Sequence, residues 1–185
     1  MPPSRSKEKV GSSGLAQFWT DYRIADPRGD DAETGVAGEI LVKGPNVISE
    51  YWNRPDAASS WEDGWFRTGD MGYSDDEGFL YISDRIKDMI ISGGENVYPA
   101  EVEAAILQMP QVQSVAVVGV PHETHGEEVC AYVVLAEGQS ATPEEIQEHV
   151  KQQVAAYKYP RTVRIIEALP KGATGKILKR ELREA

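Results

Sequence analysis

The sequence predicts an α+β protein, in which a small β-rich part is followed by a compact part that contains both helices and strands. Two observations support this fold class. From residue 21 to residue 83, short strand-like runs alternate with turn residues. After Tyr98 the rhythm changes, because apolar residues recur at helical spacing and β-branched segments follow. We therefore expect two structural parts that join near residues 85–88, and we find no internal repeat.

The β-rich part contains three stretches of strand character. Residues 21–27 and residues 38–45 each end at a proline, which cannot donate a hydrogen bond to a neighbouring strand. Residues 65–83 are typical of two strands joined across a turn at residues 74–78.

The second part begins with a predicted helix. Pro99 suits the first helical position, and apolar residues recur at helical spacing from there up to Pro110. Residues 112–121 and residues 127–138 then have the β-branched composition and the length of strands.

A second helix is predicted over residues 142–157 by the signals at its start. Thr142 can cap the helix, Pro143 suits its first position, and Glu145 completes a capping box. The elements predicted after it are a strand at residues 162–169, a glycine-containing loop and a short helical segment at residues 177–185.

Charge is distributed unevenly along the chain. The 30 acidic residues outnumber the 19 basic ones, and the net charge of −11 argues against a nucleic-acid polymer or an anionic membrane as partner. Residues 158–183 nevertheless contain eight basic and two acidic residues, whereas residues 88–150 contain no Lys or Arg. Such a basic segment suggests a local site for a small polyanion such as a nucleotide. A solvated basic helix face is the competing interpretation.

The cysteine and histidine content bears on redox and metal chemistry. The single cysteine, Cys130, excludes an internal disulfide framework, and its apolar neighbours indicate a strand, which fits a cytoplasmic protein. His122 and His125 lack further Cys or His partners, and His149 lies in a polar helical segment. We therefore predict no metal site.

The N-terminal stretch is polar and rich in Gly, Ser and Pro. We expect residues 1–19 to be a disordered lead, or one that is foreign to the natural protein. The stretch lacks a hydrophobic segment of signal-peptide or membrane-spanning length, so neither secretion by that route nor a membrane span is expected.

Three segments combine glycines with charged residues, namely residues 64–72, 84–101 and 169–182. In the first segment Asp70 follows Gly69, where a carboxylate can accept two hydrogen bonds from a vicinal diol such as a ribose. A turn-capping aspartate is the alternative interpretation, and for the residue in isolation it is the favoured one.

The other two segments also each allow a functional and a purely structural interpretation. Lys176 lies between a glycine and a helix-like run, where its ammonium can meet a phosphate or a carboxylate, although a solvated surface lysine is the alternative. The segment is not a Walker loop, because only two residues separate its glycines and Ile177 stands where Ser or Thr is required. Gly93 and Gly94 permit close approach of a ligand, or they simply form a hairpin turn.

Taken together and in this order, the motifs resemble the last third of an adenylate-forming enzyme, the superfamily of acyl-CoA synthetases, luciferases and peptide-synthetase adenylation domains. The motifs that carry the resemblance are "YWNRPDAA", "DGWFRTGD", "SGGENVYPAEVE" and "PKGATGKILKREL". The resemblance spans the chain from about residue 35 onward and is strongest to fatty-acyl and related acyl-CoA synthetases.

The resemblance implies roles for three nucleotide-binding residues. Asp70 matches the aspartate that binds the ribose hydroxyls of ATP and of the acyl-adenylate, and Arg85 matches the arginine that reaches ribose and phosphate. Lys176 matches the catalytic lysine that bridges the reacting carboxylate and the α-phosphate. A cation placed between two mutually repelling anions lowers the barrier to their reaction.

The resemblance also implies roles in the second half of the reaction. Lys87 matches the hinge about which the C-terminal domain rotates between the two half-reactions. Gly93 and Gly94 match a hairpin that faces the thiol arm of CoA after that rotation, and Arg161 lies where some relatives contact the CoA nucleotide.

The implied reaction has two steps. A carboxylate attacks the α-phosphate of ATP to give acyl-AMP and pyrophosphate, and the thiol of CoA then attacks acyl-AMP to give a thioester and AMP. ATP with Mg²⁺ and CoA are therefore expected as co-substrates, with no firmly bound cofactor, and the partners are ATP or acyl-AMP, CoA and a carboxylic acid. Any peripheral membrane contact would involve parts outside this chain.

The resemblance divides the chain as follows: a lead (1–19), the β-rich end of the large N-terminal domain, which is part of a barrel (20–84), the hinge (85–88) and the mobile C-terminal domain (89–185). Family members are several hundred residues longer, so we expect the chain alone to be inactive. Two alternatives remain: an adenylation domain that loads a carrier protein, and a non-catalytic module that binds CoA or a partner.

Overall fold

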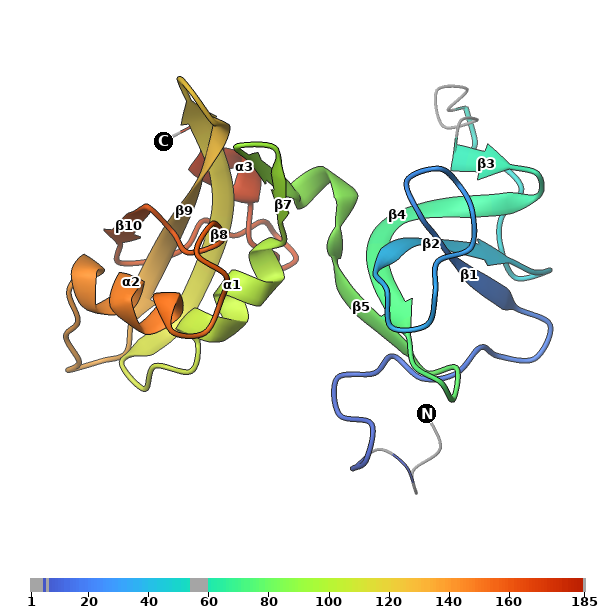
Figure 1. The fold of residues 1–185 in the computed structure, drawn as a ribbon, viewed down its shortest axis with the longest axis horizontal. Coiled ribbons are helices and arrows are strands. Elements are labelled where there is room, and N and C mark those ends of the chain that lie inside the picture. The colour runs from blue at the N-terminus through green and yellow to red at the C-terminus, as the bar shows by residue number, and fades with distance from the viewer. Residues whose placement is uncertain (1–4, 6, 54–59, 185) are drawn as a thin grey trace. The chain divides into compact units, whose positions relative to one another are not determined.

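The computed structural model describes residues 5, 7–53 and 60–184, and the chain divides into two compact units, Met1–Lys87 and Asp88–Ala185. Both units are built on β-sheets, and only the second contains α-helices within the described residues (Figure 1). The predicted α+β fold class is confirmed. No helix among the described residues is long and apolar enough to cross a bilayer.

The first unit contains a five-stranded antiparallel sheet in the order β1-β2-β4-β3, with β5 paired to β4. Its strands are β1 (Asp21–Ala25), β2 (Gly38–Lys43), β3 (Trp61–Glu62), β4 (Trp65–Ser74) and β5 (Leu80–Arg85). The long strand β4 curves and pairs with three neighbours, so the sheet curls like part of a barrel (Figure 1). Shifts of register between Glu39 and Leu41 and between Met71 and Gly72 accompany this curvature.

The turn between β4 and β5 confirms the predicted turn in this region. The Asp75 carboxylate accepts hydrogen bonds from the backbone N–H groups of Glu77 at 3.0 Å and Phe79 at 2.9 Å. Gly78 supplies a positive φ of 76°, which residues with a side chain adopt at a cost. The turn therefore places Phe79 fully inside the unit.

The N-terminal stretch contacts this turn, although we expected residues 1–19 to be disordered. Lys9 Nζ lies 2.6 Å from Asp75 Oδ2, and this hydrogen bond lowers the pKa of Asp75 to about 2. Leu80 accepts a hydrogen bond from the N–H of Ser13 at 2.7 Å and donates one to the carbonyl of Gly14 at 2.9 Å. The structure thus differs from our expectation at these described positions, because paired charges and ladder hydrogen bonds attach them to β5.

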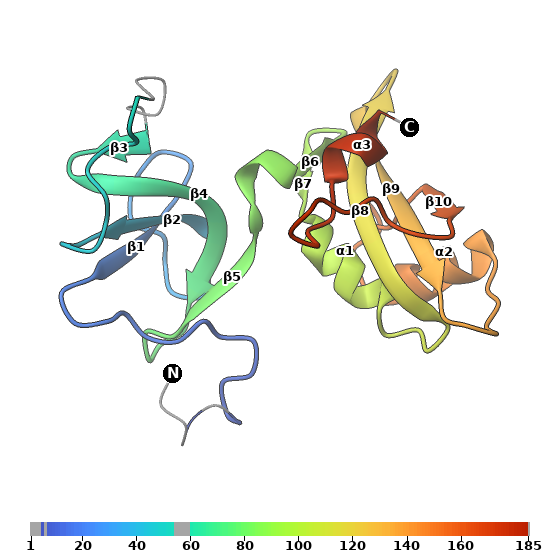
Figure 2. The same cartoon turned by 180° about the vertical axis from the view of Figure 1, so that it is seen from behind.

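The second unit contains a five-stranded sheet in the order β10-β9-β6-β7, with β8 paired to β9 (Figure 2). Its elements are the 3₁₀ helix η3 (Ile86–Asp88, which crosses the unit boundary), β6 (Ile90–Ser92), β7 (Glu95–Val97), α1 (Pro99–Ile106), β8 (Val112–His122), β9 (Gly126–Leu135), α2 (Pro143–Lys151), β10 (Thr162–Ile165) and α3 (Lys179–Arg183). Strands β9 and β10 pair in parallel, and the other pairs are antiparallel.

Both faces of this sheet are buried, and alternate residues of β8 and β9 point to opposite faces. Val117 and Ala131 pack in one apolar cluster with the helices α1 and α2, whereas Val118 and Cys130 pack in the other with Leu182 of α3. This explains why both strands are apolar runs without polar alternation. Cys130 lies in a strand, as predicted, and its burial raises the pKa of its thiol.

Helices α1 and α2 begin where the sequence predicts and end earlier, whereas α3 begins at Lys179, two residues after its predicted start. Thr142 and Glu145 form the predicted capping box, and Pro99 and Pro143 lie in the first turns. Helix α1 ends at Ile106 and α2 ends at Lys151, before the predicted ends at residues 109 and 157. Gln152 and Gln153, which follow Lys151, are polar and exposed, so their side chains add no apolar packing that would continue the helix.

Candidate functional site

Two side chains of the first unit that were predicted to bind ribose and phosphate contact each other. Asp70 on β4 and Arg85 on β5 are directly paired across the sheet, and Arg85 Nε lies 2.9 Å from Asp70 Oδ1. The bond uses one carboxylate oxygen and one guanidinium nitrogen. Both side chains are partly exposed, at 28% for Asp70 and 47% for Arg85, so a ligand can reach them.

A polar network beneath this pair fixes the backbone that carries Asp70. Glu39 on β2 is buried and accepts hydrogen bonds from Arg67 and from the N–H of Gly69 at 3.3 Å. Thr68 donates its hydroxyl to the carbonyl of Ile40 at 2.7 Å and accepts the N–H of Asp70 at 3.0 Å. The hydrogen bond to Glu39 also raises the pKa of the Arg67 guanidinium. Sequence reasoning missed this network, although a glutamate inside an apolar strand was a visible signal.

A cavity of 530 Å³ opens beside the network. Its lining combines backbone of the glycine turn with charged side chains, and the residues are Glu39, Arg67, Thr68, Gly69, Arg85, Ile86 and Lys87. Gly69 has a positive φ of 72°, and nothing lies within 4 Å of where its Cβ would be. The glycine is therefore needed for the backbone turn rather than for lack of space.

Lys176 lies in the second unit, on a tight loop that precedes α3. The N–H of Gly172 donates to the carbonyl of Lys176 at 2.9 Å, and Lys171 forms an antiparallel bridge with Ile177. Gly175 has a φ of 79°, which a side chain would disfavour. The loop holds Lys176 exposed to solvent.

The loop is anchored at both ends on the sheet. Leu169 before it and Leu182 after it are buried against the face that contains Cys130. The hydroxyl of Tyr132 donates a 2.8 Å hydrogen bond to the carbonyl of Leu182, and Lys179 Nζ lies 2.8 Å from Glu103 Oε1. The exposed Lys176 is therefore carried by a loop whose two ends are fixed to the sheet.

The predicted glycine pair forms a two-residue hairpin between β6 and β7, since Ser92 pairs with Glu95. Gly93 and Gly94 have φ values of 60° and 88°, which is the pattern of a type I′ turn. Nothing lies within 4 Å of a Cβ on Gly94. Within this unit, the hairpin alone accounts for both glycines.

Arg161 lines the same pocket as Gly93. The pocket has a volume of 180 Å³, and its lining residues are Ser92, Gly93, Glu95, His125, Val129, Tyr157 and Arg161. The guanidinium of Arg161 lies 3.9 Å from the centre of the Tyr159 ring, a cation–π contact that orients it. Tyr157 and His125 were not among the sequence-predicted residues.

Lys87, the predicted hinge, is an exposed residue of the 3₁₀ helix η3 and the last residue of the first unit. Asp70 and Arg85 belong to the first unit, whereas Lys176 and Arg161 belong to the second. The structure therefore brings Asp70 and Arg85 together in the first unit and places Gly93 and Arg161 beside one pocket in the second, whereas Lys176 lies on a separate loop of the second unit.

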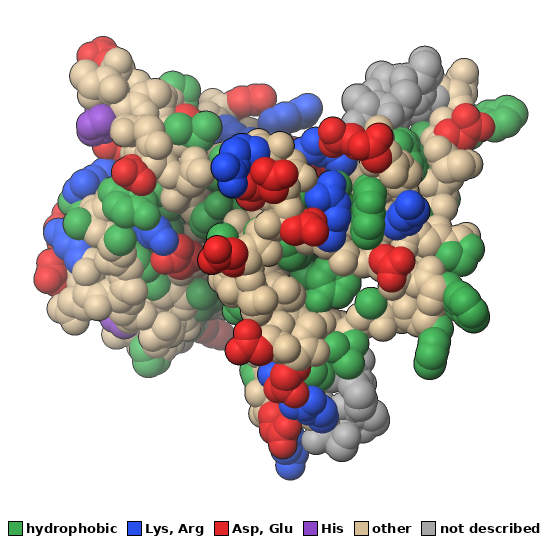
Figure 3. All heavy atoms as spheres, turned by 45° about the vertical axis from the view of Figure 1, so that its right-hand side comes forward, with side chains coloured by type: hydrophobic (Ala, Val, Ile, Leu, Met, Phe, Trp, Pro, Cys, Tyr) green, Lys and Arg blue, Asp and Glu red, His purple; other side chains and the backbone are tan. Residues whose placement is uncertain are grey.

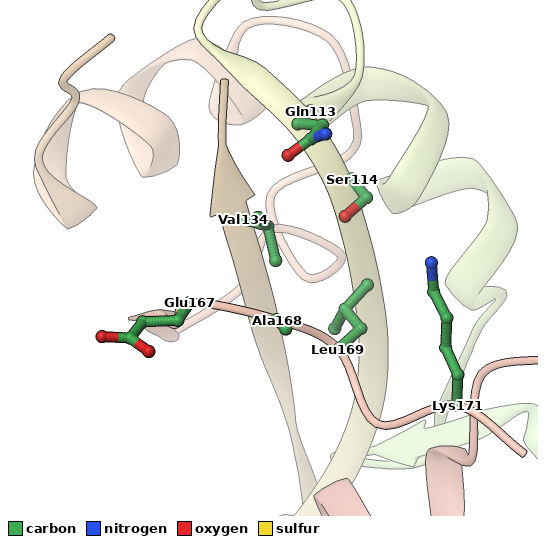
Figure 4. A pocket seen from close by; sticks show the side chains of 7 residues that line it. All are labelled: Gln113, Ser114, Val134, Glu167, Ala168, Leu169 and Lys171. Carbon is green, nitrogen blue, oxygen red and sulfur yellow. The ribbon is translucent and has the colours of Figure 1, made fainter. Parts of the chain in front are cut away.

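A further cavity of 380 Å³ lies on the second unit, between β8, β9 and the segment before the Lys176 loop. Figure 4 shows Lys171 on one side, Glu167 pointing away on the other, and Leu169 between them. None of the predicted site residues lines this cavity. On the face that Figure 3 shows, acidic and basic side chains are intermixed.

The fold and these motifs are similar to those of the C-terminal part of adenylate-forming enzymes. Residues 101–176 match the family described as AMP-binding enzyme C-terminal domain. Residues 101–176 therefore belong to this domain family, and the resemblance seen in the sequence is confirmed.

Individual relatives are CoA ligases. Long-chain-fatty-acid–CoA ligase FadD13 of Mycobacterium tuberculosis is 49% identical over 180 residues, which cover 95% of this chain and 35% of the relative. Feruloyl-CoA synthase of an Amycolatopsis species is 46% identical over 177 residues, which cover 95% of this chain and 36% of the relative. The chain thus spans about a third of the length of these curated relatives.

Solved structures of a CoA synthetase are also similar to this chain. The o-succinylbenzoate CoA synthetase MenE of Bacillus subtilis, in complex with its acyl-adenylate OSB-AMP, has a TM-score of 0.91 and 41% identity. The match covers 100% of this chain and 38% of that chain. The same enzyme has also been solved with ATP and a magnesium ion, with 42% identity and a TM-score of 0.88 over 98% of this chain and 38% of that one.

Proposed function

We propose that the chain is the C-terminal part of an ATP-dependent acid–thiol ligase that converts a carboxylic acid, ATP and CoA into acyl-CoA, AMP and pyrophosphate through acyl-AMP. The observation that carries the proposal is the direct pairing of Asp70 with Arg85 beside a cavity of 530 Å³. A carboxylate accepts the hydroxyls of a ribose, and the adjacent guanidinium donates to a phosphate.

In this proposal the pair positions the nucleotide. Asp70 would exchange part of its contact with Arg85 for the two hydroxyls of the ribose. The buried Glu39 holds Arg67 and the glycine turn in place, so the backbone at Asp70 is already ordered before a ligand arrives. Such preorganisation reduces the entropy cost of binding. Mg²⁺ would enter with ATP as part of the substrate.

Lys176 would act in the first step. Its ammonium would bridge the incoming carboxylate and the α-phosphate, whose mutual repulsion opposes reaction. An exposed lysine on a loop anchored by Leu169 and Leu182 can reach a substrate without moving the sheet that supports it. A positioned cation of this kind contributes two to three orders of magnitude in rate, at roughly the scale of an oxyanion-hole donor.

The pocket that contains Gly93 and Arg161 would act in the second step, by holding CoA. The guanidinium stacked on Tyr159 is suited to a phosphate, and the hairpin glycines would leave room beside the thiol arm. Lys87 would be the hinge between the two orientations of the second unit.

We propose a fatty acid as the carboxylic substrate, with a cytoplasmic location. The similarity to FadD13 favours this substrate, whereas the feruloyl-CoA and succinylbenzoate relatives favour an aryl acid. An adenylation domain that loads a carrier protein is the second candidate, and it would use the same Asp70, Arg85 and Lys176.

The test uses the full-length protein and separates the two half-reactions. Lys176→Ala should reduce carboxylate-dependent pyrophosphate release by about 10²–10³-fold, and thioester formation from supplied acyl-AMP should change much less. Lys171→Ala is the matched control, because Lys171 is exposed on the same loop five residues away.

Equal losses in both half-reactions for Lys176→Ala would instead indicate a shared binding role or a damaged fold. The 185-residue chain alone should release no pyrophosphate at enzymatic rates. Replacing CoA by a purified carrier protein separates the two candidate functions, since only a carrier-loading domain would then form a thioester.

A further inference from the structure

Three side chains with metal-binding atoms gather at the turn between β8 and β9, and the proposed reaction gives none of them a chemical role, although one of them, His125, lines the pocket proposed for CoA. They are His122, His125 and Glu128, and their candidate ligand atoms all lie within 4.8 Å of one another. Glu128 Oε1 is 3.8 Å from His122 Nε2 and 4.0 Å from His125 Nδ1. Two imidazoles and a carboxylate form a donor set for zinc and neighbouring transition metals.

The sequence did not reveal this cluster, and we predicted no metal site, because the two histidines lack further Cys or His partners. The hairpin register supplies a carboxylate instead. Glu128 is directly opposite Val120, and opposite residues of an antiparallel pair share a face. His122 lies two residues after Val120 on the same strand, so it shares that face too.

We propose that His122, His125 and Glu128 bind one divalent transition-metal ion of the Zn²⁺ class, with water at the remaining position. Tetrahedral zinc, with bonds of about 2.0–2.2 Å, places its ligand atoms about 3.3–3.6 Å apart. The distances of 3.8 and 4.0 Å therefore need to shorten by well under 1 Å. The side chains are 34%, 51% and 21% exposed, so they can move without disturbing the core.

The local charge favours a cation. No Lys or Arg occurs from residue 88 to residue 150, whereas Glu123 and Glu127 lie between the members of the cluster in sequence. Glu127 is occupied, because its carboxylate accepts the N–H of Ile91 at 2.9 Å, and it does not compete for the ion. Arg161, which lines a pocket with His125, carries a positive charge that opposes the binding of a cation.

The tautomer of His122 determines whether its Nε2 atom can bind a metal ion. Its Nδ1 lies 3.4 Å from the N–H nitrogen of Thr124, 3.3 Å from that of His125, and 3.3 Å from Thr124 Oγ1. Accepting the backbone N–H groups puts the proton of the neutral ring on Nε2, where it blocks a metal. To bind through Nε2, the ring must carry its proton on Nδ1.

Thr124 makes this exchange feasible. A hydroxyl can accept a hydrogen bond as well as donate one, so Thr124 Oγ1 can receive Nδ1–H. Metal-bound histidines commonly donate their second N–H in this way. The two backbone contacts that would be lost are long, at 3.3–3.4 Å, and therefore weak. Thr124 is thus a positioning residue for the site.

The binding test uses the 185-residue chain without an affinity tag, titrated with Zn²⁺ by calorimetry and with Co²⁺ by visible absorption. One ion per chain is expected. His122→Ala, His125→Ala and Glu128→Gln should each weaken binding by about tenfold or more, and Thr124→Val should weaken it by about tenfold. His149→Ala is the matched control, because it removes the third histidine, which contacts the carbonyl of Ala105 in α1 and is not part of the cluster, and it should leave binding unchanged.

Long-range ¹⁵N spectra of the histidines supply a readout that loss of structure would not mimic. With saturating Zn²⁺, His122 should change from the Nε2–H to the Nδ1–H tautomer, and His149 should not change. The proposal is overturned if the Zn²⁺ affinity is the same in the three ligand variants, or if His122 keeps its proton on Nε2 when Zn²⁺ is bound.

Discussion

The two units differ in how they bury apolar surface. In the second unit, separate apolar clusters cover both faces of the sheet. Among the described residues of the first unit, the buried apolar side chains are only Ile24, Ala25, Ile40, Leu41 and Phe79. Large side chains of the first unit also project into solvent, with Phe18, Trp19 and Trp52 at least 84% exposed, and hydrophobic side chains are visible at the surface in Figure 3.

The first unit compensates with polar contacts. The buried Glu39 with Arg67, and Lys9 with Asp75, tie its strands and its N-terminal stretch together. We infer that packing dominates the stability of the second unit, whereas hydrogen bonds and ion pairs carry more of it in the first. The predictions below test this contrast, from the largest expected effect to the smallest.

The largest effect is expected at the junction of the units. If they act as separate bodies in the full-length protein, Lys87→Pro should restrict the hinge, because proline fixes φ near −65° and removes an N–H. Thioester formation from acyl-AMP should fall steeply, by orders of magnitude, while pyrophosphate release survives in large part. Separate half-reaction rates with a melting temperature as control decide this, and a parallel decline of both rates would show that Lys87 is not the pivot.

The next effect concerns the core of the second unit. Ile106 is fully buried, so Ile106→Ala should destabilise that unit by about 2–5 kcal/mol. All four tryptophans precede residue 88 and report on the first unit alone. The unfolding transition followed by circular dichroism should therefore shift, whereas the tryptophan fluorescence transition should stay in place.

The matched control is Ile82→Ala in β5, where the side chain is 52% exposed and the expected change is within about 0.5 kcal/mol. A shift of the fluorescence transition in Ile106→Ala would mean that the two units unfold together, and the contrast between them would not hold.

A smaller effect is expected at the glycine hairpin. Gly94→Ala should destabilise the second unit by about 1–2 kcal/mol, because a left-handed backbone is costly for alanine and nothing crowds the site. Gly94→Asn should cost less, since asparagine tolerates this conformation. Chemical denaturation of both variants measures the difference, and equal costs would argue against the backbone as the cause.

The smallest effect concerns the N-terminal stretch. The hydrogen bond from Lys9 holds the pKa of Asp75 at about 2, below its ordinary value of 3.8. The stabilisation is therefore fully present above pH 3.8 and is lost as the pH falls through about 2. In Lys9→Met, the Asp75 carboxyl resonance should titrate closer to pH 3.8 by NMR, and the control Lys7→Met should leave the titration unchanged.

Local signals in the sequence predicted much of the fold. Pro99, Pro143 and the capping box at Thr142 start the helices as expected, because caps act over a few residues. The long strands β8 and β9 were equally evident from composition. The short strand β3 was missed, since two residues hold no periodicity.

The features that sequence reasoning missed depend on contacts between distant residues. Glu39 and Arg67 meet only because β2 and β4 pair, and Glu128 joins His122 only through the register of a hairpin. Asp70 and Arg85 were predicted through a family resemblance, but their direct contact required the register of β4 and β5. The ends of the helices also depended on packing that the sequence does not display.

The segment that carries Lys176 also covers an apolar face of the sheet. Leu169 and Leu182 on either side of it cover the face of the sheet that contains Val118, Cys130 and Val134. A chain cut before this segment would expose that apolar face to water, which is a condition for aggregation. We therefore expect substitutions of Leu169 or Leu182 by polar residues to lower the solubility of the protein, independently of the role proposed for Lys176.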